Sequence, residues 1–315
     1  MTAHLISRVT ILGTGLIGGS FALACKKYLT DVRISGWDRP DVLREARSVS
    51  AIDEAFAGEL APALRGADLV YVALPIGATL DLLKDIARHA SSHALVTDAC
   101  STKYRITQSA AELFPEEAGP LFLPAHPMAG KEISGIAQAD ADLFRNSTYA
   151  LIGAKRTFEQ PDVAGGLVSG SLPGSASRND PTPHDPRVSA FLKIIEKIGA
   201  RPLWLGAEQH DYAVALASHL PQLAAVALGA FLYDRLDENG LPITLAGPGL
   251  RDSLRLAGSS YGLWRDIILT NRDAISAALD LYARRLDELR ERLNSRELES
   301  DFESANDLYR LLRSL

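Results

Sequence analysis

A glycine-rich turn near the amino terminus constrains the fold of this chain more than any other feature of the sequence. The turn, Gly13-Thr-Gly15-Leu-Ile-Gly18, follows a strand-like run at residues 8–12 and precedes a helix-like run at residues 20–28. Glycines at this spacing permit a tight turn and let the backbone approach a pyrophosphate, which the helix amino terminus attracts with its free N–H groups and its dipole. The pattern predicts a dinucleotide-binding unit whose cofactor contacts are Gly13, Gly15, Leu16, Ile17 and Gly18.

Strand and helix signals continue to alternate over the first two hundred residues. Further strand-like runs lie at residues 32–37, 68–74, 94–98, 121–125, 149–152 and 202–205. This alternation predicts an α/β fold with a Rossmann-type, doubly wound parallel sheet. After Gly206 the strand signals stop, and helices are predicted at residues 208–234, 260–269 and 273–293. We therefore expect a dinucleotide-binding domain at residues 1–206, followed by an all-helical substrate and dimerisation domain at residues 207–315.

Residues 158–186 interrupt the alternation inside the first domain. The segment is rich in Gly, Ser, Pro, Asp and Asn, and a helix-like run resumes at residues 188–198. Such a composition is typical of a long surface loop or a disordered insertion, which we expect here in place of a domain linker.

Composition excludes several classes of protein. The net charge of −6 gives no basic surface for nucleic acid, and no apolar run approaches the length of a membrane helix. Two cysteines make neither a disulfide framework nor a metal cluster, and the histidines lack metal-ligand spacing. Strand-like residues begin almost at once, so no leader peptide is predicted. We expect a cytoplasmic protein that binds a small-molecule substrate and no metal.

The helical half carries more apolar surface than one thin layer of helices can bury. Within residues 273–293 the apolar residues fall close to a heptad stripe, namely Ile275, Leu279, Tyr282, Leu286, Leu289 and Leu293. A second apolar stripe continues in the tail, from Leu298 to Leu312. These stripes predict a homodimer formed by the helical domain. Pro221 lies inside the helix predicted at residues 208–234, where the lost backbone donor predicts a kink.

Asp38 carries the information on cofactor choice. It ends the second predicted strand, 20 residues after Gly18, where an acidic side chain accepts hydrogen bonds from the ribose 2′-hydroxyl. A carboxylate there repels a 2′-phosphate, which favours NAD over NADP. The adjacent Arg39 could instead hold such a phosphate, so NADP stays open as the second choice.

His126 is the candidate general base. It follows the apolar run at residues 121–123, and a loop containing Ser101 follows the run at residues 94–97. Both positions are predicted at the carboxyl edge of the same sheet as the glycine-rich turn, where open α/β sheets bind their ligands. A neutral imidazole can accept a proton at neutral pH, and Glu132 is close enough in sequence to orient it or to contact the substrate.

Five motifs, in order, resemble those of the TyrA family of prephenate, arogenate and cyclohexadienyl dehydrogenases. They are the glycine turn extended to Ser20, the run Asp98-Ala-Cys-Ser101-Thr-Lys103, the run His126-Pro-Met-Ala-Gly-Lys-Glu132-x-x-Gly135, the run Ser218-His219-Leu220-Pro221, and the pair Asp252-Ser-Leu-Arg255-Leu-Ala257 and Leu263-Trp264-Arg265-Asp266-Ile267. The resemblance implies oxidative decarboxylation of prephenate or arogenate with NAD⁺ in tyrosine synthesis.

The resemblance also implies a role for each matching residue. His126 matches the catalytic histidine of the family and Ser101 a serine near the reacting hydroxyl, while Arg255 matches an arginine that binds a substrate carboxylate. A forked guanidinium suits a carboxylate better than an ammonium does. The remaining matches line or order the substrate site, and they are Glu132, Ser218, Asp252 and Trp264.

The chain departs from the family pattern at Gln222, where many prephenate-using members carry a histidine. This departure leaves the choice between prephenate and arogenate open, and Gln222 is predicted to face the substrate side chain. A regular helix would place Asp211, Ala215, Ser218 and Gln222 on one face. For His219, helix packing and a functional role stay equally open.

Two alternative functions are compatible with the fold class alone. A 3-hydroxyacid or imine dehydrogenase pairs a similar nucleotide half with helices, but uses a Lys-x-x-x-Asn helix that this sequence lacks. A dinucleotide-binding protein without catalysis would not need His126, Ser101 and Arg255 together. Turnover in the presence of NAD⁺ separates these classes.

Overall fold

The computed structural model of the chain describes residues 6–114, 119–131, 133–153, 185–236, 240–294 and 296–314. The chain forms two compact units, which are described separately below. The first unit comprises Met1–Ala213 together with Ser259–Asn271, and the second comprises Val214–Gly258 together with Arg272–Leu315. This division passes close to the predicted boundary at residue 206, but it returns the segment 259–271 to the first unit.

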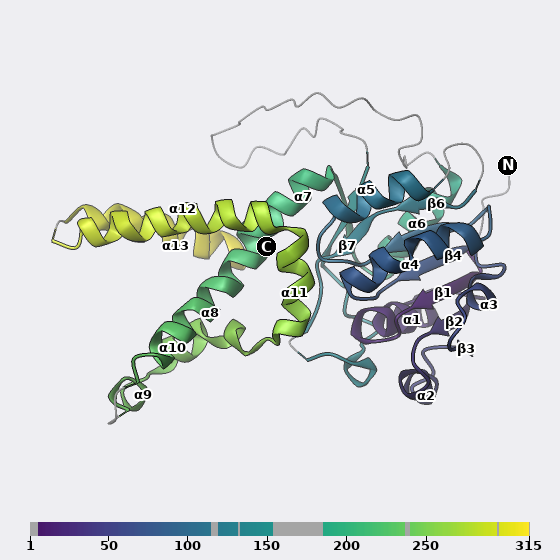
Figure 1. The fold of residues 1–315 in the computed structure, drawn as a ribbon, viewed down its shortest axis with the longest axis horizontal. Coiled ribbons are helices and arrows are strands. Elements are labelled where there is room, and N and C mark those ends of the chain that lie inside the picture. The colour runs from purple at the N-terminus through teal and green to yellow at the C-terminus, as the bar shows by residue number, and fades with distance from the viewer. Residues whose placement is uncertain are drawn as a thin grey trace. The chain divides into compact units, whose positions relative to one another are not determined.

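A six-stranded parallel sheet forms the centre of the first unit (Figure 1), as the alternating pattern predicts. The strand order is β3-β2-β1-β4-β5-β6, with the chain winding outward in both directions from β1. The strands are β1 (Arg8–Leu12), β2 (Arg33–Trp37), β3 (Glu54–Phe56), β4 (Leu69–Val72), β5 (Leu95–Asp98) and β6 (Leu121–Leu123). The point where the order reverses, between β1 and β4, is where doubly wound sheets bind nucleotides.

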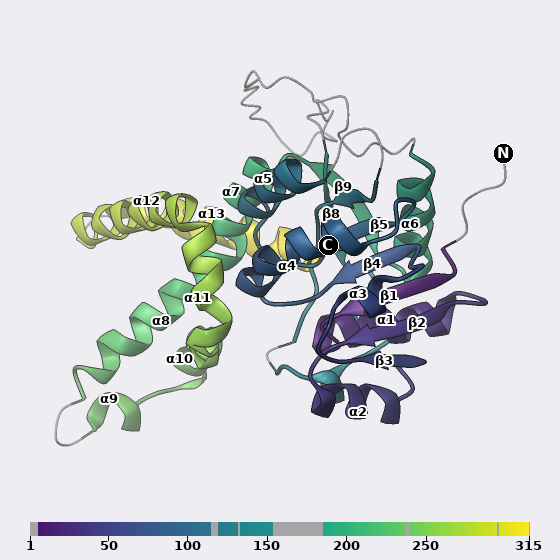
Figure 2. The ribbon, with the colours of Figure 1, turned by 45° about the vertical axis from the view of Figure 1, so that its right-hand side comes forward.

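Helices cover both faces of this sheet (Figure 2), and each face has its own apolar core. One core includes side chains of α1 (Leu16–Tyr28), α2 (Pro40–Ser48) and α6 (Pro186–Lys197). The other includes side chains of α3 (Ala61–Leu64), α4 (Ile76–His89), α5 (Tyr104–Leu113) and α11 (Tyr261–Thr270). Strands β1, β4 and β5 are buried on both faces, which explains their nearly continuous apolar sequence.

Two strands that the sequence analysis assigned to the large sheet, at residues 149–152 and 202–205, form a separate sheet together with a short strand that the sequence did not predict. The second sheet has the order β7-β8-β9, with β7 (Ala125–Pro127) antiparallel to β8 (Thr148–Ile152) and β9 (Arg201–Leu205) parallel to β8. Pro124 separates β6 from β7, because its nitrogen has no hydrogen to continue the ladder. His126 follows the carboxyl end of β6, as predicted, but it lies in β7 of the second sheet, where it pairs with Ala150.

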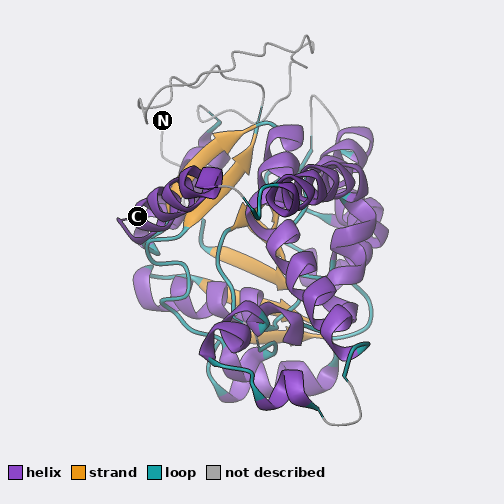
Figure 3. Cartoon of the chain, turned by 90° about the vertical axis from the view of Figure 1, so that its left-hand side faces the viewer, coloured by secondary structure: helices purple, strands orange, loops and turns teal. Residues whose placement is uncertain are grey.

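The described residues of the second unit are helical apart from turns, as predicted (Figure 3). The longest helices are α8 (Leu220–Tyr233), α12 (Arg272–Glu291) and α13 (Glu299–Ser314). Between α8 and α12 lie three shorter elements of this unit, α9 (Leu241–Thr244), α10 (Pro248–Ser253) and the 3₁₀ turn η3 (Arg255–Gly258), and a 3₁₀ turn η4 (Arg296–Leu298) precedes α13.

Pro221 lies in the first turn of α8, where the missing N–H is tolerated. A π-helical turn, η2 (Ala215–His219), joins α8 to α7 (Ala207–Val214), and this turn interrupts the 3.6-residue period. As a result Ser218 is exposed while Gln222 is buried, although a regular helix would have placed both on one face.

The sequence was expected to hold no apolar run of the length of a membrane helix, but the continuous helix Ala207–Tyr233 is long and apolar enough to cross a membrane when judged by length and composition alone. The core helix of a soluble protein passes the same test. The predicted insertion at residues 158–186 lies outside the described residues except for Asp185 and Pro186. These two begin α6, where the Asp185 carboxylate accepts a hydrogen bond from the Arg187 backbone N–H.

Candidate active site

The three glycines of the amino-terminal turn have different roles. Gly13 has φ +90°, and a Cβ at this position would lie 2.5 Å from the carbonyl oxygen of Ala73. A Cβ on Gly18 would lie 1.9 Å from the carbonyl oxygen of Gly13. A Cβ on Gly15, at the start of α1, would have no atom within 4 Å. Gly13 and Gly18 are thus required by the fold of the turn, whereas Gly15 leaves open space at a helix amino terminus, as a pyrophosphate requires.

Asp38 is fixed in an orientation that suits a ribose. One carboxylate oxygen accepts a hydrogen bond from the backbone N–H of Thr14 at 2.7 Å, and the other accepts one from that of Arg39 at 2.7 Å. The contact with Thr14 holds the end of β2 beside the glycine turn. Arg39 itself is exposed and lies 3.7 Å from the carboxylate of Asp41. The turn and Asp38 together fit a dinucleotide.

We predict that the variants Gly15→Ala and Gly18→Ala separate cofactor binding from folding. Gly15→Ala should leave the thermal unfolding midpoint nearly unchanged and weaken NAD⁺ binding, because the added methyl group fills space meant for the pyrophosphate. Gly18→Ala should lower stability by about 1–3 kcal/mol, because it overpacks the turn. Calorimetric unfolding and NAD⁺ titration of both variants test this. Unaltered NAD⁺ affinity in Gly15→Ala would contradict the placement of the cofactor.

A buried ion pair joins the loop after β5 to the start of β7. Asp98 and Lys103 are both completely buried, and the Lys103 ammonium donates to the Asp98 carboxylate and also, at 2.7 Å, to the carbonyl oxygen of Ala125. The Asp98 carboxylate accepts the backbone N–H groups of Cys100 at 3.0 Å and of Ala125 at 3.1 Å. The pair therefore binds Cys100, the residue before Ser101, and Ala125, the residue before His126.

His126 lies at one end of a chain of hydrogen bonds. Its Nδ1 lies 2.9 Å from Nε2 of His210, and Nδ1 of His210 lies 2.8 Å from Oδ1 of Asp211. His210 and Asp211 belong to α7 and are almost fully buried, with 1% and 4% of their surface exposed. A histidine backed by a second histidine and a carboxylate is suited to accept a proton, because the buried carboxylate stabilises the resulting positive charge.

Asp211 also caps α5. Its two carboxylate oxygens accept the backbone N–H groups of Lys103 at 2.7 Å and Tyr104 at 2.9 Å, where α5 begins. Its own backbone carbonyl accepts the Asn271 side chain at 2.7 Å. One carboxylate thus connects the segment that follows Ser101 with His210 and, through His210, with His126.

Neighbouring residues of the first unit have structural roles. Cys100 is buried beside Thr79, and burial raises the pKa of its thiol to about 12, which makes it unreactive. Asp266 forms an ion pair with Arg265 at 2.9 Å. It also accepts the Gly77 N–H, a hydrogen bond that lowers the pKa of its carboxyl. Trp264, three positions before Ile267 on α11, is partly buried against the core beneath α4 and α5.

Four predicted substrate residues belong to the second unit: Ser218, Gln222, Asp252 and Arg255. Gln222 is buried, and its Nε2 donates to the carbonyl oxygen of Leu256 at 2.8 Å, which holds α8 beside the turn that contains Arg255. Asp252 and Arg255 are exposed. Pro248, which lies between two glycines shortly before Asp252, fits the first turn of α10. Glu132, the remaining predicted residue, lies outside the described residues.

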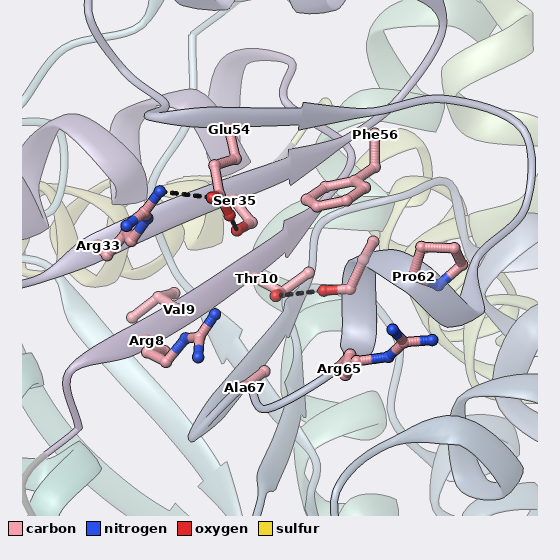
Figure 4. Close-up of a pocket in the computed structure, with 11 residues that line it drawn as sticks. Arg8, Val9, Thr10, Arg33, Ser35, Glu54, Phe56, Pro62, Arg65 and Ala67 are labelled. Carbon is pink, nitrogen blue, oxygen red and sulfur yellow. Dashed lines mark hydrogen bonds and ion pairs between the residues drawn. The ribbon is translucent and has the colours of Figure 1, made fainter.

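A hollow of about 290 Å³ lies where the strands of the large sheet begin, at the edge opposite their carboxyl ends (Figure 4). It is lined by first residues of strands, including Arg8, Arg33 and Glu54, and Arg33 forms an ion pair with Glu54. The catalytic candidates lie at the carboxyl ends of the strands, so this hollow is separate from them. Among the described residues, no group of three or more His, Cys, Asp or Glu side chains could hold a metal ion.

The sequence analysis did not identify His210 and Asp211 as parts of the site. His210 enters that analysis only as one of the histidines that lack metal-ligand spacing, and Asp211 only as one position on a helix face. The hydrogen bond between His126 and His210 joins residues 84 positions apart, so the sequence around His210 contains no pattern that points to His126. Lys103 and Asp98 were present in a recognised motif, but their burial against β7 was not predicted.

Comparison with known proteins gives a consistent result over the whole chain. Residues 21–162 match the family model for the prephenate dehydrogenase nucleotide-binding domain, and residues 206–313 match that for the prephenate dehydrogenase dimerization domain. The chain is 30% identical over 297 residues to a prephenate dehydrogenase of Bacillus subtilis, covering 93% of this chain and 72% of that protein. It is 28% identical over 290 residues to a cyclohexadienyl dehydrogenase of Zymomonas mobilis, covering 92% and 89%.

The fold is likewise similar to a solved structure. The crystal structure of prephenate dehydrogenase from Aquifex aeolicus, in complex with hydroxyphenyl propionate and NAD⁺, superimposes with a TM-score of 0.79. The match covers 98% of this chain and 97% of the other at 24% sequence identity, which supports the similarity of fold.

Proposed function

Since the chain belongs to the prephenate dehydrogenase family, we propose that it oxidises and decarboxylates prephenate or arogenate in tyrosine biosynthesis, with His126 as the general base. The family predicted from the sequence motifs is confirmed, and so is the class of enzyme. The observation that carries the assignment of the base is the buried chain from His126 through His210 to Asp211.

NAD⁺ supplies the chemistry of a hydride acceptor when it is bound at the glycine turn. We infer NAD⁺ rather than NADP⁺ because Asp38 is held by Thr14 and Arg39 in a position that disfavours a 2′-phosphate. Arg39 is the residue that would favour NADP⁺, and its ion pair with Asp41 directs it toward another partner. Membership of a soluble enzyme family and two buried, unpaired cysteines support a location in the cytoplasm.

The proton leaves the ring hydroxyl of the substrate, and the hydride leaves the carbon that bears this hydroxyl. Nε2 of His126 accepts the proton of the ring hydroxyl as the hydrogen on the hydroxyl-bearing carbon departs as hydride, so that this carbon becomes a carbonyl. The bond from the ring to its carboxylate then breaks, CO₂ leaves, and the electron pair of that bond enters the ring, whose oxygen regains a proton to give a phenol. Ser101 is assigned to the hydrogen bond that orients the hydroxyl.

Substrate binding is assigned chiefly to the second unit. Arg255 is proposed to bind a carboxylate of the substrate through its forked guanidinium. Gln222 is proposed to contact the side chain of the substrate. Its Nε2 donates to the carbonyl oxygen of Leu256, and this hydrogen bond leaves the amide oxygen to accept from the substrate. Glu132, Ser218, Asp252 and Trp264 are proposed to line or order the site.

Assay of the purified protein with each substrate and each cofactor tests the proposal directly. We expect reduction of NAD⁺ in the presence of prephenate or arogenate, with release of CO₂, and slower turnover with NADP⁺. Failure of both substrates to reduce either cofactor would overturn the proposed activity and would favour a 3-hydroxyacid or imine dehydrogenase, or a non-catalytic dinucleotide-binding protein.

We predict that His126→Asn lowers kcat by about 10²–10⁴-fold, the usual contribution of a general base. The affinity for NAD⁺, measured by fluorescence titration, should change little, since His126 lies in β7 and not in the glycine turn. In the unsubstituted enzyme kcat should fall at acid pH as His126 takes up a proton. Near-full activity in His126→Asn would remove this residue from the chemistry.

We predict that Gln222→His shifts preference toward prephenate. The amide oxygen of Gln222 can accept from the ammonium group of arogenate, whereas a histidine can become cationic and favour the keto-acid side chain of prephenate. One such polar contact is worth about 0.5–1.5 kcal/mol, or about 2- to 13-fold in the ratio of kcat/KM values. We expect the unsubstituted enzyme to accept arogenate at least as well as prephenate. An unmoved ratio would show that Gln222 does not read the side chain.

We predict that the second unit forms a homodimer. Apolar side chains of α12, of α13 and of the turn after α12 are exposed in the isolated chain, where Leu286 is 49%, Leu293 67%, Phe302 68% and Leu312 62% exposed, although Ile275 at the start of α12 is buried. Both apolar cores of the described chain contain residues of the first unit only. Surface of this size on an enzyme is normally covered by a partner. Light scattering at micromolar concentration should give twice the chain mass of 33.9 kDa, and a monomer would contradict the prediction.

A further inference from the structure

The two nitrogens of His210 are both engaged, and this fixes how the protons are distributed in the chain of side chains that ends at His126. Nδ1 of His210 lies 2.8 Å from Oδ1 of Asp211, and Nε2 lies 2.9 Å from Nδ1 of His126. The two imidazole rings meet edge to face, with centroids 5.1 Å apart and an interplanar angle of 67°. Such a geometry directs a ring nitrogen of one histidine toward a ring nitrogen of the other.

Asp211 decides which nitrogen of His210 carries a proton. Its carboxylate already accepts the backbone N–H groups of Lys103 and Tyr104, both of which can only donate. An ionised carboxylate with two donors on it offers only acceptor positions to a third partner. His210 must therefore donate to Asp211 from Nδ1, which in the neutral ring leaves a lone pair on Nε2.

The lone pair on Nε2 of His210 decides the state of His126 in turn. It can accept a hydrogen bond only from a protonated Nδ1 of His126, so the lone pair of the neutral His126 ring lies on Nε2. If instead His210 carried protons on both nitrogens, it would donate to Nδ1 of His126, whose proton would then reside on Nε2. In that arrangement Nε2 could not act as a base.

We propose that His210 is a positioning residue which, anchored by Asp211, holds His126 in the Nδ1–H tautomer that leaves Nε2 as the proton acceptor. This inference rests on the proposed role of His126 as the general base, but the tautomer itself can be observed without substrate. An imidazole in water prefers the opposite tautomer, with the proton on Nε2. The hydrogen bond with His210 thus leaves Nε2 of His126 able to accept a proton before the substrate binds.

The same contacts stabilise the product of proton transfer. When Nε2 of His126 takes the proton of the substrate hydroxyl, its Nδ1–H continues to donate to His210, and the positive charge is balanced through His210 by the Asp211 carboxylate. His210 and Asp211 are almost fully buried, so water screens this interaction little. The other charged groups nearby, Asp98 and Lys103, are engaged with one another.

Nitrogen-15 NMR of protein labelled at histidine tests the tautomer directly, in the absence of substrate and cofactor. The signals of His126 are identified by their loss in His126→Asn. At a pH where His126 is neutral, we expect a proton on Nδ1 and none on Nε2. A proton on Nε2 in the unsubstituted protein would overturn the inference, whatever the enzyme turns over. An absence of turnover with the expected tautomer would instead count against the proposed activity alone.

Two substitutions of His210 separate positioning from packing. His210→Phe keeps an aromatic ring but removes the acceptor, so the His126 proton should move to Nε2, and kcat should fall about 10- to 100-fold, as for other orienting partners. His210→Gln supplies an amide oxygen that can accept from Nδ1–H. It should retain the Nδ1–H tautomer and recover part of the lost kcat. Both variants should bind NAD⁺ with unchanged affinity.

His93→Gln is the matched control. His93 lies in the same unit beside Asp68, at the opposite edge of the sheet, and 44% of its side chain is exposed. This variant should leave the His126 signals and kcat unchanged. If His210→Phe fails to fold, the labelled wild-type protein and His210→Gln still decide the matter. Retention of the Nδ1–H tautomer and of full kcat in His210→Phe would contradict the proposal.

Discussion

The buried ion pair between Asp98 and Lys103 is the interaction on which the candidate site depends. Removing two charges from water costs several kcal/mol for each ion, and this is offset only when the remaining hydrogen-bonding positions are filled. Here the carboxylate accepts two backbone N–H groups and the ammonium donates to a backbone carbonyl as well. The pair thereby fixes the Ser101 loop and the first residue of β7 at one place where β5 and β6 end.

Asp211 extends this arrangement to α7. It caps α5 directly after Lys103, and the same carboxylate orients His210 and through it His126. The backbone at the start of β7, the backbone at the start of α5 and the His210 side chain of α7 are consequently held by two buried acids. Asp98 and Asp211 each accept three hydrogen bonds from groups whose positions the fold determines. These hydrogen bonds can hold His126 rigidly through His210.

The two units solve the problem of burying apolar surface differently. The first unit has a core on each face of its large sheet. The second unit consists of elongated helices whose apolar side chains are largely exposed in the single chain. The homodimer proposed above would cover these side chains and so stabilise this unit.

The sequence by itself determined the class of fold, the cofactor turn and the family. These depend on local signals: the glycine spacing around Gly15, the acid at position 38, and the periodicities of 2 and 3.6 residues. Only the tertiary structure decided that the chain passes from the large sheet to the second sheet at Pro124. It likewise decided that a π-helical turn, which contains the exposed Ser218, precedes the buried Gln222. It also decided that His210 contacts His126 across 84 residues, because a hydrogen bond between distant segments depends on how strands and helices pack and leaves no periodic trace in the sequence.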